Sequence, residues 1–372
     1  MRLLFYIHSL TGGGAERVLA TLVSAFMNKG YECGIAQIDE VNKCPYSLPE
    51  GVSMFNVADS KPLYSRLPFN KIKRRLWKFH SIRKVAKEYK PDVVISFITA
   101  LNNDVIFSLL GTGLPVIVSE HTNITRKIDK KGKHTFLYRK ICYPFANAVT
   151  VLTRRDYRLI YKKHDNVVYM PNPCDVDNSV SNLVYEKKKV VFTAGRVSSW
   201  WIKGYDLLLT AWGKICKDYN DWRLVIAGDY NDKSMEYLQQ VINDNNCKNV
   251  DFIGFRRDVY NLMTQSEVYC LSSRIEGLPM GLIEAMSAGC CCVAFDCETG
   301  PNEIIVNNES GLLAAAEDID DLCEKLRKVM SDDSLRNQLS SRSKEQVKKY
   351  SVNRVVKRWE ILFELVLKGR RK

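Results

Sequence analysis

The 372-residue sequence has no hydrophobic run approaching the roughly 18–20 residues that a membrane-spanning helix needs. Its 12 cysteines show no paired metal-ligand spacing, and only five histidines are present. Cys290, Cys291 and Cys292 are consecutive in an apolar stretch that predicts a buried strand. We therefore expect free thiols in a reducing cytosol and no zinc site. The short apolar run 3–8 leads into glycines instead of a cleavage site, which predicts a first strand and not a signal peptide.

Acidic residues are scarce in the first half of the chain. Residues 1–178 contain 27 Lys+Arg and 15 Asp+Glu, a net +12, whereas residues 179–372 contain 28 and 27, a net +1. This asymmetry favours an anionic partner surface, either a membrane or a nucleic acid. A solvated basic face would give the same composition.

The densest basic segment, 66–90, has ten Lys+Arg and a single acid, Glu88. Apolar residues recur through it at helical spacing, and these are Ile72, Leu76, Phe79, Ile82 and Ala86. The pattern predicts an amphipathic helix that lies on an anionic membrane, or packs its apolar stripe on a sheet, or does both. The five basic residues expected to matter most are Lys71, Lys73, Arg74, Arg75 and Lys78.

Apolar runs alternate with helical patterns along both halves, which predicts an α/β protein with parallel, doubly wound sheets. The most informative stretch is 268–295, which is predicted to run from a buried strand through a turn and a helix at about 281–288 into a second buried strand. Glu276 lies before the predicted helix and Glu284 lies on it. Ligands bind at the carboxyl ends of parallel strands, and carboxylates there accept hydrogen bonds from sugar hydroxyls.

The string EGLPMGLIE, with its continuation AMSAG, resembles the E-x7-E signature of the retaining glycosyltransferases of family four, also called group 1. The resemblance covers almost the whole chain and implies the GT-B fold of two Rossmann-like domains. Pro171-Asn172-Pro173 resembles the family's hinge. The implied division is an acceptor-binding domain 1–173, a nucleotide-sugar-binding domain 174–349, and a C-terminal helix 350–372 that crosses back to the first domain.

The resemblance also implies the roles of individual residues. Arg196 and Lys203 would neutralise the donor diphosphate, although Trp200-Trp201 widens the usual gap between them. Glu276 would hold the transferred sugar, Glu284 the ribose, and His121, in the string SEHTN, the donor sugar. The remaining expected donor-binding residues are Gly13, Gly14, Gly254, Phe255, Gly277, Leu278 and Met280. The implied chemistry is front-face attack without a protein nucleophile.

We expect no cofactor and no divalent metal. Asp175 and Asp177 form a D-x-D, but it follows a proline-rich linker, unlike the metal site of GT-A enzymes. The expected substrates are a UDP-sugar, carrying a hexose or N-acetylhexosamine, and a lipid-linked glycan made in bacterial polysaccharide biosynthesis. We expect a cytoplasmic enzyme peripheral to the cell membrane, and no nucleic-acid partner.

Two alternatives remain open. A GT-B-fold UDP-sugar 2-epimerase would carry more acids and histidines for proton transfer, and it would produce an epimer without an acceptor. A non-enzymatic nucleic-acid binder would use the basic half, but no helix-turn-helix, zinc knuckle or aromatic RNA-binding string is present.

Overall fold

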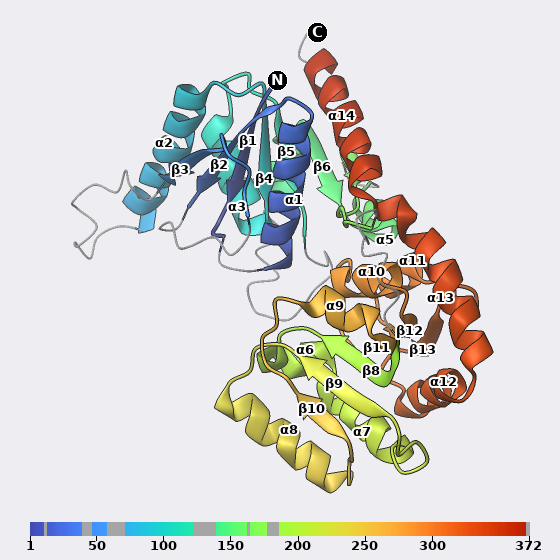
Figure 1. Ribbon diagram of the computed structural model, residues 1–372. Helices are drawn as coiled ribbons and strands as arrows, with labels where there is room; N and C mark the ends of the chain where they lie inside the picture. The colour runs from blue at the N-terminus through green and yellow to red at the C-terminus, as the bar shows by residue number, and fades with distance from the viewer. Residues whose placement is uncertain are drawn as a thin grey trace. The chain divides into compact units, whose positions relative to one another are not determined.

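The computed structural model describes residues 1–10, 13–38, 47–57, 71–121, 139–161, 164–176 and 186–369. The chain forms two compact units (Figure 1), one made of Met1–Pro173 with Val352–Lys372 and the other of Cys174–Ser351. Each unit has one sheet, and every strand pair described in either sheet is parallel. This confirms the predicted α/β class.

The first unit contains a seven-stranded sheet in the order β3-β2-β1-β4-β5-β6-β7. Its strands are β1 (Arg2–Ile7), β2 (Glu32–Gln37), β3 (Ser53–Asn56), β4 (Val93–Phe97), β5 (Val116–Ser119), β6 (Ala148–Val151) and β7 (Val167–Tyr169). The chain proceeds from β1 towards one edge and from β4 towards the other. The topological switch point, where open α/β sheets bind ligands, therefore lies between β1 and β4.

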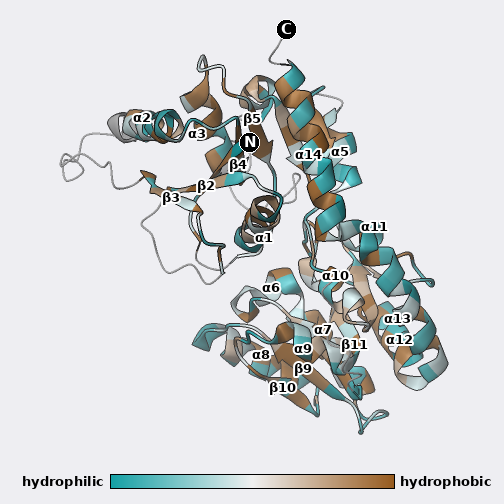
Figure 2. Cartoon of the chain, turned by 45° about the horizontal axis from the view of Figure 1, so that its top comes forward, coloured by the Kyte–Doolittle hydropathy of each residue, from teal (hydrophilic) through white to brown (hydrophobic). Residues whose placement is uncertain are grey.

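Helices cover both faces of this sheet. They are α1 (Gly14–Asn28), α2 (Lys71–Tyr89), α3 (Thr99–Leu109), α5 (Arg154–Tyr161) and α14 (Val352–Gly369). Leu3 and Phe5 of β1 pack in one cluster with α1 and α14, whereas Leu4 and Tyr6 pack in another with α2 and α3. The alternation of a strand thus gives each face its own apolar core. Figure 2 shows both hydrophobic and hydrophilic residues on α14, as expected of a helix with one buried side.

The second unit has a six-stranded sheet in the order β10-β9-β8-β11-β12-β13. Its strands are β8 (Lys188–Ala194), β9 (Arg223–Ala227), β10 (Val250–Phe252), β11 (Ser266–Leu271), β12 (Cys291–Asp296) and β13 (Leu312–Ala315). Its helices are α6 (Trp200–Lys203), α7 (Tyr205–Ile215), α8 (Asp232–Asp244), α9 (Val259–Thr264), α10 (Met280–Ser287), α11 (Pro301–Ile304), α12 (Ile319–Ser331) and α13 (Asp333–Val347). The switch point lies between β8 and β11, because the chain continues from them to opposite edges.

The triple cysteine lies where the sequence predicts. Cys290, Cys291 and Cys292 are at most 1% exposed, and burial raises the pKa of the Cys290 thiol to about 11 and that of Cys291 to about 12. Eleven cysteines are described, and all are free. They act as small apolar side chains.

Gly311 leads directly into β13, where Leu312 and Ala314 are buried against β12. The helix α2 forms as the sequence predicts; among the described side chains of its apolar stripe, Ile82 and Ala86 are buried and Leu76 is 60% exposed. Asp104 of α3 pairs with Lys78 and Arg75, so the side of α2 that faces α3 at this level is charged and Leu76 points elsewhere.

Candidate active site

Two loops meet at the switch point of the second unit. One runs from β8 through Arg196 and α6 to α7, and the other runs from β11 to α10. The Ser272 hydroxyl donates to the Lys203 carbonyl at 2.9 Å, and the Arg274 amide donates to the Ile202 carbonyl at 2.9 Å. Gly204 has φ +64°, and a Cβ there would lie 1.8 Å from the Ser272 carbonyl oxygen, so only glycine permits this approach.

The structure brings Lys203 and Glu276 together from these two loops. The Lys203 Nζ lies 2.8 Å from the Glu276 Oε1, which also accepts a hydrogen bond of 2.7 Å from the Ser273 hydroxyl. The residues that separate Arg196 from Lys203 form a 3-10 turn, Val197–Ser199, and the helix α6, which begins with Trp200 and Trp201. The carboxylate of Glu276 is therefore largely desolvated, with its side chain 10% exposed, and is paired with one cation.

Arg196 is exposed at the N-terminal side of the same loop. Among the residues that the structure describes, no hydrogen bond or ion pair to its guanidinium is found. The first turn of α10 begins at Met280, and its leading N–H groups lack intrahelical acceptors. An exposed guanidinium and a helix N-terminus are both suited to an anion.

Glycines follow each of three adjacent strands. Gly195 follows β8, Gly228 follows β9 and Gly254 follows β10. The Gly228 amide donates to the Gly254 carbonyl at 2.8 Å, and a Cβ at Gly228 would lie 1.8 Å from the Gly195 carbonyl oxygen. Phe255, beside Gly254, is 70% exposed and offers a free aromatic face. Gly228 was not among the expected site residues, although a glycine directly after a buried strand is the signal that could have indicated it.

The loop before α10 packs against the segment that contains Thr299 and Gly300. A Cβ at Gly300, which has φ +101°, would lie 2.6 Å from the Gly277 carbonyl oxygen. The Thr299 hydroxyl donates to the Glu276 carbonyl. Leu278 is 6% exposed, so its side chain belongs to the core and only its backbone can face a ligand. Thr299 and Ser273 were missed by sequence reasoning, because their contacts depend on how three loops fold together.

Two phenols lie beneath these loops. The Tyr205 hydroxyl is 3.0 Å from a Cβ built at Gly195, and the Tyr269 hydroxyl is 2.8 Å from a Cβ built at Gly281. Burial raises the pKa of both Tyr205 and Tyr269, so both phenols are neutral at physiological pH. The expected ribose ligand Glu284 lies on α10 and is half-buried.

In the first unit, His121 lies two residues after the end of β5, as expected for a residue at the carboxyl end of a strand. Its ring stacks on Phe97 with centroids 4.6 Å apart and an interplanar angle of 13°. Its Nε2 lies 3.0 Å from the Ser119 hydroxyl. Burial lowers the pKa of His121 to about 3, which makes the imidazole neutral at pH 7.

The neighbouring Glu120 is 1% exposed, and its carboxylate accepts hydrogen bonds from three side chains. Arg139 forms hydrogen bonds of 3.1 Å to each of its carboxylate oxygens. Thr99 donates to it at 2.6 Å, and Tyr143 donates to it as well. This buried network fixes the end of β5 and leaves no carboxylate lone pair exposed for a substrate.

Gly13 and Gly14 lie at the N-terminus of α1, as the sequence predicts. The Gly13 amide donates to the carboxylate of Glu16, which sequence reasoning did not single out. The space around Gly14 is open, since a Cβ there would have no heavy atom within 4 Å among those compared. Glu16 therefore already places a negative charge at this helix end.

In the described part of the chain, no group of three or more His, Cys, Asp or Glu side chains is arranged to hold a metal ion. Asp177, the second acid of the D-x-D, lies outside the described residues. Nor does any described helix have the length and apolar character to cross a bilayer.

This fold is widely shared among solved structures. A glycosyltransferase from Rickettsia africae has 16% identity and a TM-score of 0.81, with 99% of this chain and 98% of that chain covered. Anabaena HepE, solved in complex with UDP and glucose, has 16% identity and a TM-score of 0.79, with 97% and 98% covered.

The sequence matches two family models, "Glycosyl transferases group 1" over residues 177–346 and "Glycosyltransferase Family 4" over residues 12–178. An α-1,4-N-acetyl-D-galactosaminyltransferase of Campylobacter jejuni, named for an undecaprenol-diphosphate-linked acceptor, is 31% identical over 96% of this chain and 97% of its own length. The amylovoran biosynthesis glycosyltransferase AmsD of Erwinia amylovora is 26% identical over 96% and 98%. The chain therefore belongs to the group 1 glycosyltransferases of family four, and it is a glycosyltransferase with the GT-B fold.

Proposed function

We propose that this enzyme transfers an N-acetylhexosamine or hexose from a UDP-sugar to a lipid-linked glycan, with retention of the anomeric configuration. The observation that carries the proposal is the Lys203–Glu276 ion pair at the switch point of the second unit, beside the exposed Arg196. It supports the proposal because a cation suited to a leaving diphosphate contacts a carboxylate suited to sugar hydroxyls.

In this scheme the diphosphate draws Lys203 away from Glu276 as it binds. Lys203, Arg196 and the N-terminus of α10 then stabilise the negative charge that develops as the glycosidic bond breaks. Glu276, released from its cation, accepts hydrogen bonds from the sugar hydroxyls and orients the anomeric carbon. The acceptor hydroxyl attacks from the side of the leaving group, and the departing phosphate oxygen takes its proton.

The nucleoside would lie along the glycine row and α10. Glu284 would accept hydrogen bonds from the ribose, and Gly254 and Phe255 would contact the base. The Phe255 ring is free for such a contact. No divalent ion is needed in this scheme, because the protein supplies the positive charge.

The proposed acceptor follows from the relatives. Three are named for undecaprenol-diphosphate-linked acceptors and N-acetylgalactosamine transfer, at 31%, 24% and 30% identity, the last over 50% of this chain. The basic first unit is suited to an acceptor that lies at an anionic membrane surface. We therefore propose a protein that acts at the cytoplasmic face of the cell membrane without spanning it.

A nucleotide-release screen tests the donor. The protein is incubated with a panel of UDP- and GDP-sugars, with and without a synthetic polyprenyl-diphosphate-linked N-acetylhexosamine, and product linkage is read by NMR. We expect acceptor-dependent release of UDP, an α-linked product and activity that survives excess chelator. A β-linked product would contradict retention. Loss of activity on chelation, restored by manganese, would contradict the metal-free scheme, and an epimer formed without acceptor would favour an epimerase.

A further inference from the structure

Three side chains, those of Thr150, Ser119 and His121, are linked by hydrogen bonds within the first sheet. The Thr150 hydroxyl on β6 lies 2.8 Å from the Ser119 hydroxyl on β5, and the Ser119 hydroxyl lies 3.0 Å from the His121 Nε2. Thr150 is 1% exposed and Ser119 is 2% exposed, so solvent supplies neither with a partner. The other ring nitrogen, Nδ1, is buried and has no hydrogen-bond partner among the residues that the structure describes.

The number of available protons decides which group donates in each of these two hydrogen bonds. If Thr150 donates to Ser119 and Ser119 donates to Nε2, both hydroxyl protons are used and only one group, the Nδ1–H, is unsatisfied. If the Nε2–H donates to Ser119 instead, one of the two hydroxyl protons, that of Ser119 or that of Thr150, is left without an acceptor, and the Nδ1 lone pair also lacks a partner. Buried polar groups without partners are destabilising, so the first arrangement is favoured.

A flip of the His121 ring would not give the Nδ1–H an acceptor while keeping the hydrogen bond with Ser119. The plane of the ring is fixed by the stack on Phe97, and a half-turn about the Cβ–Cγ bond would replace Nε2 by a carbon next to Ser119. Nor is a nearby carboxylate free to take the ring proton, because Glu120 is saturated by Arg139, Thr99 and Tyr143.

We propose that Thr150 and Ser119 are positioning residues that hold His121 as the neutral Nδ1–H tautomer, so that the ring donates a hydrogen bond to an oxygen of the sugar substrate and exchanges no proton during transfer. The identity of the acceptor oxygen rests on the proposed function, whereas the tautomer does not. Among Thr150, Ser119 and His121, the Nδ1–H is the one donor without an acceptor, and it gains one only when substrate is bound.

The tautomer is measured directly by ¹⁵N NMR of the histidine side chains in the full-length protein without substrate. With five histidines in the chain, the His121 signals are assigned by comparison with His121→Asn. We expect a protonated Nδ1 and an unprotonated Nε2 at pH 7. In Ser119→Ala we expect the ring to shift towards the Nε2–H form that free imidazole side chains prefer. Ser108→Ala, another serine that is 2% exposed, is the matched control and should leave the signals unchanged.

The second readout is transfer. Ser119→Ala should lower kcat/KM by about five- to tenfold, the effect of one hydrogen bond, and Ser108→Ala should not. A wild-type His121 that is protonated on Nε2, or on both nitrogens, overturns the proposal. A tautomer that Ser119→Ala leaves unchanged overturns the relay. A tautomer that changes while transfer is unaffected overturns the positioning role. If no nucleotide sugar is turned over at all, the proposed function fails while the NMR result still decides the relay.

Discussion

At the scale of single residues, the Lys203–Glu276 pair makes a prediction about transfer. Glu276→Gln keeps the hydrogen bond from Ser273 but loses the charge that pairs with Lys203 and orients the sugar. We expect kcat to fall by roughly 10²–10³, as when an electrostatic transition-state contact is removed, with little change in thermal stability. Glu284→Gln should instead raise the KM of the donor. Near-normal steady-state kinetics in both variants would show that the site is elsewhere.

His121 makes a prediction about pH. Its pKa is lowered to about 3 in the folded protein and is about 6.5 when unfolded, so below pH 6.5 the unfolded state binds more protons. The contribution of this group to stability is therefore fully present above pH 6.5. It falls as the pH drops towards 3, by at most about 1.4 kcal/mol per pH unit.

Urea denaturation of wild type and His121→Asn between pH 4 and 8 measures this slope. The difference in the free energy of unfolding between the two proteins should depend on pH below 6.5 and be constant above it. A constant difference throughout would mean that the imidazole is solvated and titrates normally.

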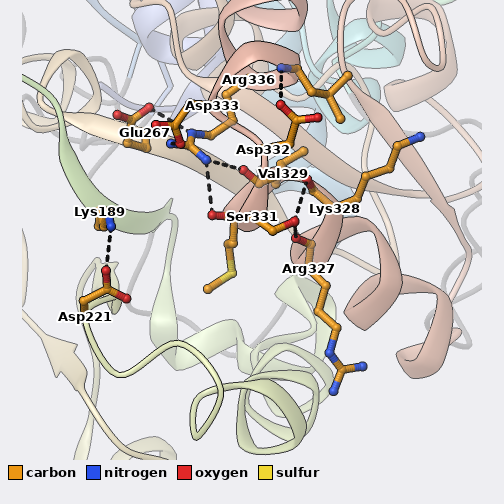
Figure 3. A network of polar contacts seen from close by, with 12 residues as sticks. Lys189, Asp221, Glu267, Arg327, Lys328, Val329, Ser331, Asp332, Asp333 and Arg336 are labelled. Atoms are coloured by element: carbon orange, nitrogen blue, oxygen red, sulfur yellow. Dashed lines mark hydrogen bonds and ion pairs between the residues drawn. The ribbon is translucent and has the colours of Figure 1, made fainter.

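At the scale of elements, Arg336 connects α12, α13 and β11 (Figure 3). Its guanidinium donates to the Val329 carbonyl at 2.6 Å and to the Met330 carbonyl at 3.2 Å, which caps the end of α12. It also pairs with Asp333 and, at 3.2 Å, with Glu267 of β11. Arg336 is 4% exposed and the Glu267 side chain is 21% exposed, so this pair has limited access to water, whereas the Asp333 side chain is 82% exposed and hydrated.

Arg336→Met should therefore destabilise the second unit by about 3–5 kcal/mol, because it leaves Glu267 and two helix-end carbonyls without a partner. Lys189→Met, which breaks the exposed pair with Asp221 in the same view, should lower the free energy of unfolding far less, because water solvates both groups. Equal losses in urea denaturation would mean that the Arg336 network is as solvated as the surface pair.

The helix α2 makes a prediction about membranes. Arg75 and Lys78 share Asp104, at 3.9 and 2.6 Å, so part of the expected basic surface is neutralised within the protein. Lys71, Lys73 and Arg74 begin the helix, but their side chains lie outside the described residues. If α2 lies on an anionic bilayer, Asp104→Asn should strengthen binding to anionic vesicles, since each basic residue released contributes on the order of 1 kcal/mol.

Co-sedimentation with anionic vesicles at low and high salt measures this. Changing Lys71, Lys73, Arg74 and Arg75 to Glu should abolish binding and slow transfer to a lipid-linked acceptor more than donor hydrolysis. The exposed Leu76 should add to wild-type binding, so Leu76→Ser should weaken it. Wild-type protein that ignores such vesicles at low salt would show that the basic surface is only solvated.

At the scale of the whole molecule, α14 completes the core of the first unit from the far end of the chain. Trp359 is 3% exposed in one cluster with β1 and α1. Trp359→Ala should destabilise the first unit by about 3–5 kcal/mol, whereas Ile361→Ala, at a position 52% exposed, should change little. Hydrogen exchange should show faster exchange in β1 and β4 of the Trp359 variant, with β8 and β11 unaffected. Equal loss of protection in both units would mean that they unfold as one.

The sequence predicts most strands because each is a short apolar run, as in Val93–Phe97, buried on both faces of a parallel sheet. It does not predict α8, whose polar sequence buries only Ser234 and Leu238 and is held by a capping box at Asn231. The E-x7-E motif indicates where the site lies, since its two acids flank a predicted helix start. The contact of Glu276 with Lys203 is not predictable, because it depends on the three-dimensional path of the residues that separate Arg196 from Lys203.

The return of α14 has a consequence for biosynthesis. Residues 174–351, that is 178 residues, are translated between the two parts of the first unit. At roughly 5–20 residues per second this takes about 9–36 s. During that interval the apolar surface of α1 that later contacts Phe363 has no partner from α14. We therefore expect the nascent first unit to expose this apolar surface to chaperones until α14 leaves the ribosome, whereas the second unit, which is continuous in sequence, can fold as soon as it emerges.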